Sequence, residues 1–315
     1  VLKHADWMIE MGKGAGADGG TVISEGTIED ISKNPQSVIG PFLSDQYEAR
    51  IRPVLQTASM FEKGSIHLET GTIHTVYPLD VRIPMGRLTV VTGVSGSGKT
   101  TMVLESLIPA LKAKISGQNL PGHVKNIEAE GITQVKLIDA TPIGINVRST
   151  VATYANVHDE LRKVYAKTKD AKERAFKAGD FSYNTGKLRC STCDGTGDIS
   201  LDVQFLPDVK IPCPDCRGSR YSRDAFDIRR KAKDGNEYSL PELMNMSVDQ
   251  VMHALGGLKL VQQRLQVLHS LGLGYLTLGE ETPGLSGGEA QRLKLASEMG
   301  KGQSDAVFVF DEPTI

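Results

Sequence analysis

The sequence is poor in cysteine and in net charge, and it has no long hydrophobic run. Four cysteines in 315 residues are too few for a secreted disulfide scaffold, which favours a reducing compartment. A formal net charge of -2 gives no overall attraction to nucleic acid, so any such affinity must come from a local cluster. We see no window of about 18 apolar residues and no secretory leader. We therefore expect a globular, cytoplasmic protein with no membrane partner.

All four cysteines fall in one stretch, as two Cys-x-x-Cys pairs. Cys190 and Cys193 form the first pair, Cys213 and Cys216 form the second, and 19 residues separate the pairs. This spacing predicts a four-thiolate zinc site, because a redox Cys-x-x-Cys would be single and would open a helix. The residues between the pairs, "ISLDVQFLPDVKIP", favour a two-stranded ribbon that turns near Pro207 and brings the pairs together.

A phosphate-binding loop is the clearest motif. "GVSGSGKT", from Gly93 to Thr100, matches G-x-x-x-x-G-K-[ST]. The apolar segment Arg87–Val91 before it predicts a buried strand, and apolar residues at helical spacing follow it. Glycines let backbone N–H groups reach phosphate oxygens, while the lysine and the threonine suit phosphate and magnesium. The candidate nucleotide-binding residues are Gly93, Ser95, Gly96, Gly98, Lys99, Thr100 and Thr101.

An acidic pair follows an apolar strand near the end of the chain. The strand pattern covers Val307–Phe310, and Asp311 and Glu312 come next. Alone, such a pair would be an ordinary surface feature. With a phosphate loop upstream, we expect Asp311 to support magnesium and Glu312 to activate the attacking water, so that Lys99 and Glu312 are the catalytic candidates.

A second anion-binding helix start is predicted at "LSGGEAQR", Leu285 to Arg292. Ser286, Gly287 and Gly288 open a helix whose first N–H groups suit a phosphate. One nucleotide in one domain rarely needs two such helix starts. We therefore expect this one to contact ATP bound to the phosphate loop of another domain.

These motifs together resemble a known family. "LSGGEAQR" shortly before "FVFDEPT" resembles the signature and Walker B motifs of the ABC ATPase superfamily. About 185 residues separate Thr100 from Leu285, far more than in ABC transporter subunits. Over nearly the whole chain, "VTGVSGSGKTT", "RCSTCDGTG", "FLPDVKIPCPDCRGSRY" and "LGLGYLTLGEETPGLSGGEAQRLKLA" resemble UvrA, the damage-recognition ATPase of bacterial nucleotide excision repair.

The resemblance implies an α/β fold, a P-loop ABC-type ATPase core with an inserted zinc-binding and helical region. Residues 1–45 are expected to be the tail of a preceding ABC module, and 46–65 a linker. The second module is expected to consist of a P-loop part at 66–114, an insertion at 115–265 with the zinc module at 187–223, and a signature helix and Walker B strand at 266–315. The chain does not begin with Met and stops inside a motif, so we expect a piece of a longer protein.

The chain departs from the family at two places. UvrA proteins usually read Asp-Gln-Ser-Pro-Ile-Gly where this chain has Asp139 to Gly144 with Ala140 in place of the glutamine. The segment "RSTVATY" lacks the usual proline. Alanine cannot hydrogen-bond through its side chain, so the link between nucleotide state and the inserted region is expected to differ. Both departures indicate a diverged UvrA paralogue, of the kind associated with tolerance of DNA-binding drugs.

A basic stretch follows the second cysteine pair. From Arg217 to Lys233 the net charge is +5 over seventeen residues, which suits DNA phosphates. Lys187 and Arg189 extend this cluster. The alternative is that the zinc module is structural only. The DNA-binding candidates are Arg217, Arg220, Arg223, Arg229, Arg230, Lys231 and Lys233.

The resemblance implies an ATP-dependent, damage-recognising DNA-binding ABC ATPase of nucleotide excision repair or DNA-drug tolerance. Its cofactors would be ATP, magnesium and zinc. Its partners would be double-stranded DNA, a second ABC module of the same parent chain, a second copy of the parent and a UvrB-like protein. The piece alone is expected to hydrolyse ATP poorly. The alternatives are an ABC subunit of a membrane transporter and an inactive structural fragment.

Overall fold

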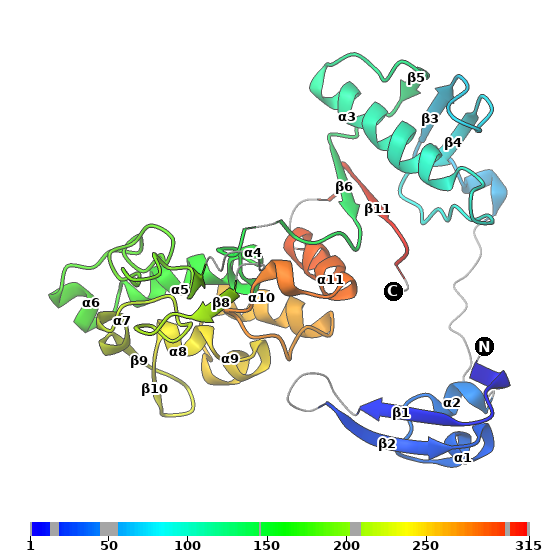
Figure 1. Ribbon diagram of the computed structural model, residues 1–315. Coiled ribbons are helices and arrows are strands. Elements are labelled where there is room, and N and C mark those ends of the chain that lie inside the picture. Colours follow the sequence, from blue (N-terminus) through cyan, green and yellow to red (C-terminus); the bar gives the residue numbers. More distant parts are fainter. Residues whose placement is uncertain are drawn as a thin grey trace. The chain divides into compact units, whose positions relative to one another are not determined.

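The computed structural model describes residues 2–12, 19–44, 56–144, 146–201, 209–299 and 303–313. The chain forms two compact units, whose elements are shown in Figure 1. The cysteine-bearing unit comprises Val1–Glu48, Asp139–Met299 and Glu312–Ile315. The P-loop unit comprises Ala49–Ile138 and Gly300–Asp311. Within the described ranges, no helix is both long and apolar enough to cross a bilayer.

The N-terminal segment is a hairpin followed by two short helices. After the turn η1 (Leu2–His4), β1 (Met8–Gly12) pairs antiparallel with β2 (Thr21–Gly26). The helix α1 (Ile28–Lys33) begins at a reciprocal cap, and α2 (Gly40–Leu43) follows. Met8, Ile31 and Leu43 form the small core of this segment.

An antiparallel sheet and one helix form most of the P-loop unit. After the turn η3 (Thr57–Ser59), the central strand β3 (Ser65–Thr70) pairs with β4 (Asp80–Pro84) on one side and β5 (Val124–Glu128) on the other. The helix α3 (Ile108–Ser116) packs against β5 and against β6 (Gln134–Ile138). Their shared core includes Leu68, Leu107, Leu111 and Ile127.

A second pair of strands completes this unit. β6 pairs parallel with β11 (Ala306–Phe310), in register from Gln134 opposite Ala306 to Ile138 opposite Phe310. The strand predicted before Asp311 is therefore confirmed. Figure 1 shows β6 and β11 running side by side, although more than 160 residues separate them in the sequence.

The strand predicted for Arg87–Val91 is wrong in this structure. β4 ends at Pro84, and residues 88–93 belong to no strand. Leu88 and Val90 are 77% and 76% exposed. A buried parallel strand needs a hydrogen-bonded neighbour and covering helices, because apolar sequence alone does not satisfy its backbone groups. In the described part of the chain this segment pairs with neither β11 nor β3, so its apolar side chains stay in solvent.

Short helices build the 139–299 part of the cysteine-bearing unit, with two hairpins attached. The hairpins are β7 (Asp198–Leu201) with β8 (Val209–Pro212), and β9 (Arg229–Lys231) with β10 (Glu237–Ser239). The first confirms the predicted ribbon, whose turn near Pro207 lies outside the described residues. The helices are α4 (Val151–Tyr154), α5 (Val157–Tyr165), α6 (Lys169–Glu173), α7 (Asp224–Asp227), α8 (Leu240–Met244), α9 (Val248–Ala254), α10 (Lys259–Ser270) and α11 (Gly287–Glu298), with the turn η5 (Thr282–Gly284) before the last.

Local sequence signals fix where several of these helices start. Ser239 and Ser247 each cap a helix and accept a hydrogen bond from the backbone N–H three residues on, at Glu242 and Gln250. The Glu242 and Gln250 side chains bond back to the cap backbone, so both sites are capping boxes, a motif that Ser-x-x-Glu and Ser-x-x-Gln predict. Such caps contribute about 1 kcal/mol each, which helps helices of only five and seven residues to form.

Buried aromatic residues join the helices to the cysteine region. Phe181, Tyr183 and Tyr221 are fully or almost fully buried in one core with α5, α8 and α10. The Tyr221 hydroxyl donates to the Phe181 carbonyl over 3.0 Å, and His158 Nε2 lies 2.7 Å from the same hydroxyl. We therefore assign the proton of His158 to Nε2, and burial lowers the pKa of this ring to about 3.

Candidate functional site

The phosphate loop depends on glycines in conformations that other residues avoid. Gly96 and Gly98 have φ of +80° and +90°, and a Cβ on Gly98 would lie 2.5 Å from Cγ2 of Val76. The Lys99 ammonium donates to the carbonyls of Gly93 and Val94, both over 2.8 Å. The lysine therefore lies over the loop itself, where it can transfer its hydrogen bonds to an anion.

A widened helical turn follows the loop. Thr100 is its cap and Thr101–Leu107 form η4, a π-helical segment that continues into α3. The Ser106 hydroxyl donates to the Thr101 carbonyl over 2.9 Å, which supports the wide turn. Ser95 and Thr100 are exposed, so both hydroxyls are accessible. The predicted helix is thus present, with a π-helical first segment of a kind that often occurs at functional sites.

The acidic pair stands at the carboxyl end of β11. The Asp311 backbone N–H donates to the Ile138 carbonyl over 3.1 Å, which extends the pairing with β6 by one residue. Glu312 follows with φ of +44°, in the left-handed region that a glutamate rarely adopts. Both side chains are exposed. Lys99 and Asp311 belong to the P-loop unit, whereas Glu312 belongs to the cysteine-bearing unit.

Ser286 caps the predicted signature helix, α11. Its hydroxyl accepts from the Glu289 backbone N–H, and the Glu289 carboxylate accepts from the Ser286 N–H over 2.7 Å. The Tyr275 hydroxyl donates to the same carboxylate. Burial would raise the pKa of Glu289, but these hydrogen bonds outweigh it and the pKa is lowered. Burial and then Glu289 raise the pKa of Tyr275 to about 12.

The structure adds one residue that the sequence did not suggest, Lys294 on α11. Its ammonium donates to the carbonyls of Asp139 and Thr141 over 3.1 and 2.7 Å, and to the Asp139 carboxylate. Burial would raise the pKa of Asp139, but the bonds from Lys294 and Thr141 lower it. A Cβ on Gly287 would lie 3.2 Å from Cβ of Ala140. Gly287 and Lys294 are seven residues apart, about two helical turns, so both lie on the face of α11 that contacts residues 139–141.

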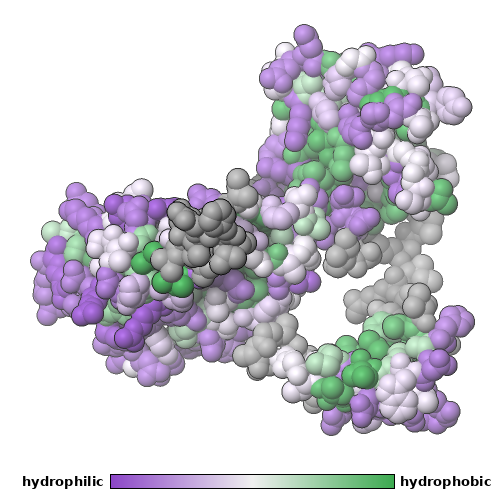
Figure 2. All heavy atoms as spheres, in the orientation of Figure 1, coloured by the Kyte–Doolittle hydropathy of each residue, from purple (hydrophilic) through white to green (hydrophobic). Residues whose placement is uncertain are grey.

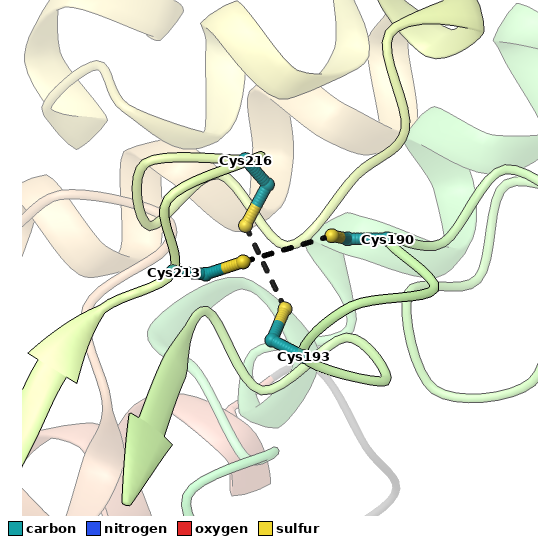
Figure 3. A group of neighbouring side chains, drawn as sticks. All are labelled: Cys190, Cys193, Cys213 and Cys216. Carbon is teal, nitrogen blue, oxygen red and sulfur yellow. Dashed lines mark hydrogen bonds between the residues drawn. The ribbon is translucent and has the colours of Figure 1, made fainter.

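The four cysteines form one cluster, with their sulfur atoms pointing at a common centre (Figure 3). The Sγ atoms of Cys190 and Cys213 lie 3.9 Å apart, and those of Cys193 and Cys216 lie 3.6 Å apart. All four residues are buried. A tetrahedral ion with metal–sulfur bonds of about 2.3 Å requires sulfur atoms about 3.8 Å apart, so the cluster fits such an ion.

Two tight turns hold the sulfur atoms in place. Asp194 and Gly195 have φ of +51° and +77° after the first pair, and Arg217 and Gly218 have +49° and +86° after the second. A Cβ on Gly195 would lie 1.8 Å from the Tyr183 carbonyl oxygen, so only glycine fits against the aromatic core.

The surroundings of the thiols shift their pKa values in different directions. Burial raises the pKa of Cys190, and it raises the pKa of Cys216 to about 12. For Cys193 burial acts in the same direction, but the Gly197 N–H, 3.3 Å from the sulfur, and the neighbouring thiols reverse the shift and lower its pKa. Metal binding would therefore have to release protons from this cluster.

The basic residues after the second pair differ in their exposure and in their pairing. Arg217, Arg223, Lys231 and Lys233 are exposed, as is Lys187. Arg189 is half-buried and pairs with Asp194 over 2.8 Å. Arg229 donates to both carboxylate oxygens of Glu242 over 2.6 and 2.8 Å. Arg230 lies on β9, half-buried, with its guanidinium 3.5 Å from the Lys231 carbonyl.

The interpretation of Arg220 changes. The residue is 5% exposed, and its guanidinium pairs with Glu281 over 2.8 Å and donates to the Val147 carbonyl over 3.0 Å. It also lies 5.3 Å from the centre of the Tyr183 ring. Its charge is neutralised inside the unit, so it is not available to DNA phosphates. Sequence spacing missed this because Glu281 is 61 residues away.

Comparison with known proteins finds one group that is similar to this chain over its whole length. No family model matches the chain. UvrABC system protein A of Thermus thermophilus is 38% identical over the whole chain, and that of Lactococcus lactis is 40% identical. The crystal structure of UvrA2 from Deinococcus radiodurans matches 99% of the chain with a TM-score of 0.85 and 36% identity. The chain spans 32% and 33% of the two curated relatives and 37% of the solved chain. The predicted fold class, an α/β ABC-type core with an insertion that carries the cysteines, is confirmed.

Proposed function

Because the chain is a segment of the UvrA family that spans about a third of its relatives' length, we propose that it is the ATP-dependent, DNA-binding second ABC module of a damage-recognition ATPase. The observation that carries the proposal is the full-length match to a UvrA2 structure, with the P-loop, the capped signature helix and the cysteine cluster all inside the matched region. The alternative of a transporter subunit has no such support, because the relatives named above are UvrA proteins.

Each motif then has a role in nucleotide chemistry. Lys99 and the loop glycines would bind the phosphates, and the hydroxyls of Thr100 and Thr101 would contribute to binding a magnesium ion. Asp311 would hold the water shell of that ion, while Glu312 would orient and deprotonate the attacking water. Ser286, Gly287 and Gly288 would contact a nucleotide bound to a different module. Magnesium, when bound, would neutralise charge on the phosphates.

The cysteine cluster is proposed to hold zinc through Cys190, Cys193, Cys213 and Cys216. Buried, closed, four-thiolate sites are typical of structural zinc, which would fix the two turns against the aromatic core. The proposed partners are double-stranded DNA, the preceding ABC module, a second copy of the parent and a UvrB-like protein, in the cytoplasm. Residues 1–45 would belong to that preceding module.

Ala140 supports assignment to a diverged paralogue. It occupies the position where UvrA proteins usually have glutamine, and its Cβ lies against Gly287 of the signature motif. The methyl group makes an apolar contact where an amide would make hydrogen bonds. We propose that this position couples nucleotide state to the inserted region less strongly here than in housekeeping UvrA.

ATP turnover by the intact parent chain tests the catalytic part of the proposal. Lys99→Ala should abolish ATP binding at this module, whereas Glu312→Gln should preserve binding there and abolish this module's share of turnover, because one residue binds phosphate and the other activates water. Lys112→Ala, an exposed lysine of the same unit, is the matched control. Unchanged turnover in the Glu312→Gln parent would remove Glu312 from the chemistry.

A further inference from the structure

The structure contains a hollow lined mainly by basic residues, which we call the cationic groove. Its volume is about 480 Å³, and it lies in the cysteine-bearing unit. Five of its eight lining residues are basic and none is acidic. The lining residues are Val164, Lys167, Thr168, Lys169, Arg229, Arg230, Lys231 and Leu258.

Two segments that are distant in the sequence build this groove. Lys167 lies in the turn between α5 and α6 and Lys169 is the first residue of α6, whereas Arg229, Arg230 and Lys231 are the three residues of β9. The basic stretch recognised from the sequence supplied only the second group. The first group lies in a helical segment whose balanced charges gave no sign of a binding surface.

Two side-chain contacts hold the segments together. The hydroxyl of Tyr165, the last residue of α5, donates to the Tyr238 carbonyl on β10 over 2.6 Å. Tyr238 is the register partner of Arg230, so this bond places the end of α5 beside β9. Arg174, after α6, donates through both Nη atoms to the Asp227 carboxylate over 3.2 and 3.3 Å. The groove is therefore built by the fold and not by a chance meeting of surface side chains.

The charges in the groove are only partly neutralised. Arg229 pairs with Glu242 over 2.6 Å, and Lys169 lies 3.7 Å from Glu173. No carboxylate of the described residues lies within ion-pair distance of Lys167, Arg230 or Lys231. Three like charges gathered in one hollow repel one another, and an anionic ligand would relieve that repulsion.

We propose that the cationic groove binds the sugar-phosphate backbone of duplex DNA. The cations lie along two separate elements, a spread that suits successive phosphates of one strand better than a single small anion. The apolar residues Val164 and Leu258 also line the groove and leave no carboxylate to repel a phosphate. This inference rests on the proposed function, and it places the DNA contact at β9 and the α5–α6 turn instead of at Arg217, Arg220 and Arg223.

Fluorescence anisotropy with a labelled duplex tests the groove in the full chain, with the dissociation constant measured over a series of chloride concentrations. Lys167→Gln with Lys231→Gln should weaken binding about tenfold for each substituted lysine at 0.1 M salt, and should lower the slope of log K against log salt by about 1 for each. Lys112→Gln with Lys125→Gln removes the same charge from exposed sites of the P-loop unit and should change neither quantity. Urea unfolding verifies that both double variants stay folded.

Other results would overturn the proposal. If Arg217→Gln with Arg223→Gln lowers the slope and the groove variant does not, DNA contacts lie elsewhere and the proposed function survives without the groove. If the unaltered chain shows no salt-dependent DNA binding, both the groove and the DNA-binding part of the proposed function fail. If inorganic phosphate displaces DNA better than chloride at equal ionic strength, the groove is a small-anion site. If polyglutamate binds as tightly as DNA with the same dependence on Lys167 and Lys231, it is a site for acidic proteins.

Discussion

The cysteine cluster and the segment Arg87–Val91 before the phosphate loop differ in where their stabilising partners lie. Those of the cluster are close in the sequence, whereas a strand at Arg87–Val91 would need distant ones. The cluster has all four ligands within 27 consecutive residues, from Cys190 to Cys216, and every one is buried. The apolar segment Arg87–Val91 has the composition of a core strand, yet Leu88 and Val90 are exposed. In Figure 2 the part of the chain that contains α4–α11 presents a mostly hydrophilic face, while a patch of hydrophobic residues lies on the P-loop unit.

The difference concerns the range of the interactions that each region needs. The cluster is closed by two tight turns and one hairpin, all local in sequence. A parallel strand must find partners from distant parts of the chain, because its own residues cannot satisfy its backbone groups. The cysteine cluster, held together by local contacts, therefore forms, whereas Arg87–Val91 forms no strand.

Replacement of one cysteine should have the largest effect. Cys213→Ser should abolish zinc binding and reduce the free energy of unfolding of the cysteine-bearing unit by at least about 5 kcal/mol, since structural zinc contributes its binding energy to folding. Elemental analysis should give about one zinc for the unaltered chain and none for the variant. Hydrogen exchange should quicken at residues 187–201 and stay unchanged at β3.

Ser191→Ala is the matched control for that variant, because Ser191 is exposed and lies between the first two ligands. It should keep both the zinc and the protection from exchange. A Cys213→Ser protein that retained zinc and stability would show that the cluster does not depend on four ligands.

Replacement of the buried Arg220 should have the second-largest effect on stability. Arg220→Ala leaves Glu281 without its partner and Tyr183 without its stacked guanidinium, so we expect a loss of about 3–5 kcal/mol in unfolding free energy. The exposed Arg223→Ala should cost less than about 0.5 kcal/mol. Urea unfolding measures both. Equal costs for the two variants would contradict the buried role of Arg220.

The pH dependence of the aromatic core should follow His158. Burial lowers the pKa of this ring from 6.5 to about 3 in the folded state. Between those values the unfolded chain binds a proton that the folded chain does not, so stability falls as the pH falls below about 6.5. At pH 5 the loss should be about 2 kcal/mol.

Comparison with His158→Gln isolates this contribution. The unaltered protein should lose about 2 kcal/mol more than the variant between pH 7 and pH 5, in urea unfolding with zinc in excess. Shifts common to other groups cancel in that difference. Identical pH profiles for the two proteins would show that His158 is not the titrating group.

The smallest effect on stability is expected for a substitution in the segment Arg87–Val91, which forms no strand. Val90→Asn should change the unfolding free energy by less than about 0.5 kcal/mol, because the side chain is already 76% exposed. Leu161→Ala, in the core of the other unit, should cost about 2–5 kcal/mol. A cost above about 2 kcal/mol for Val90→Asn would mean that the segment packs as a strand in solution and would remove the contrast between the two regions.

Residues whose partners are near in sequence could be predicted from sequence alone. The caps at Ser239 and Ser247 and the cysteine pairs are examples, since each is closed within a turn or a hairpin. Arg220, Lys294 and Tyr165 could not be interpreted in this way. Their partners lie 61, 155 and 73 residues away, and nothing in a charge or hydroxyl pattern reveals which distant group it meets.

Two apolar segments of the P-loop unit illustrate the same limit. The strand β11 was predicted from the same kind of apolar run as Arg87–Val91, and only β11 formed. The difference is β6, whose five residues pair with β11 in register. Apolar composition indicates that a segment can be buried, and the available neighbours decide whether it is.

Tyr183 contacts both the first cysteine turn and the start of α4. Its carbonyl oxygen lies against Gly195 in the first cysteine turn, as described above. At its other end the hydroxyl donates to the Arg148 carbonyl over 3.1 Å and lies 3.0 Å from the hydroxyl of Thr150, the cap of α4. The ring between these two ends is buried and cannot bend. A change in the geometry of the first turn, such as the departure of a bound metal, would therefore be transmitted to the cap of a helix more than thirty residues away in the sequence.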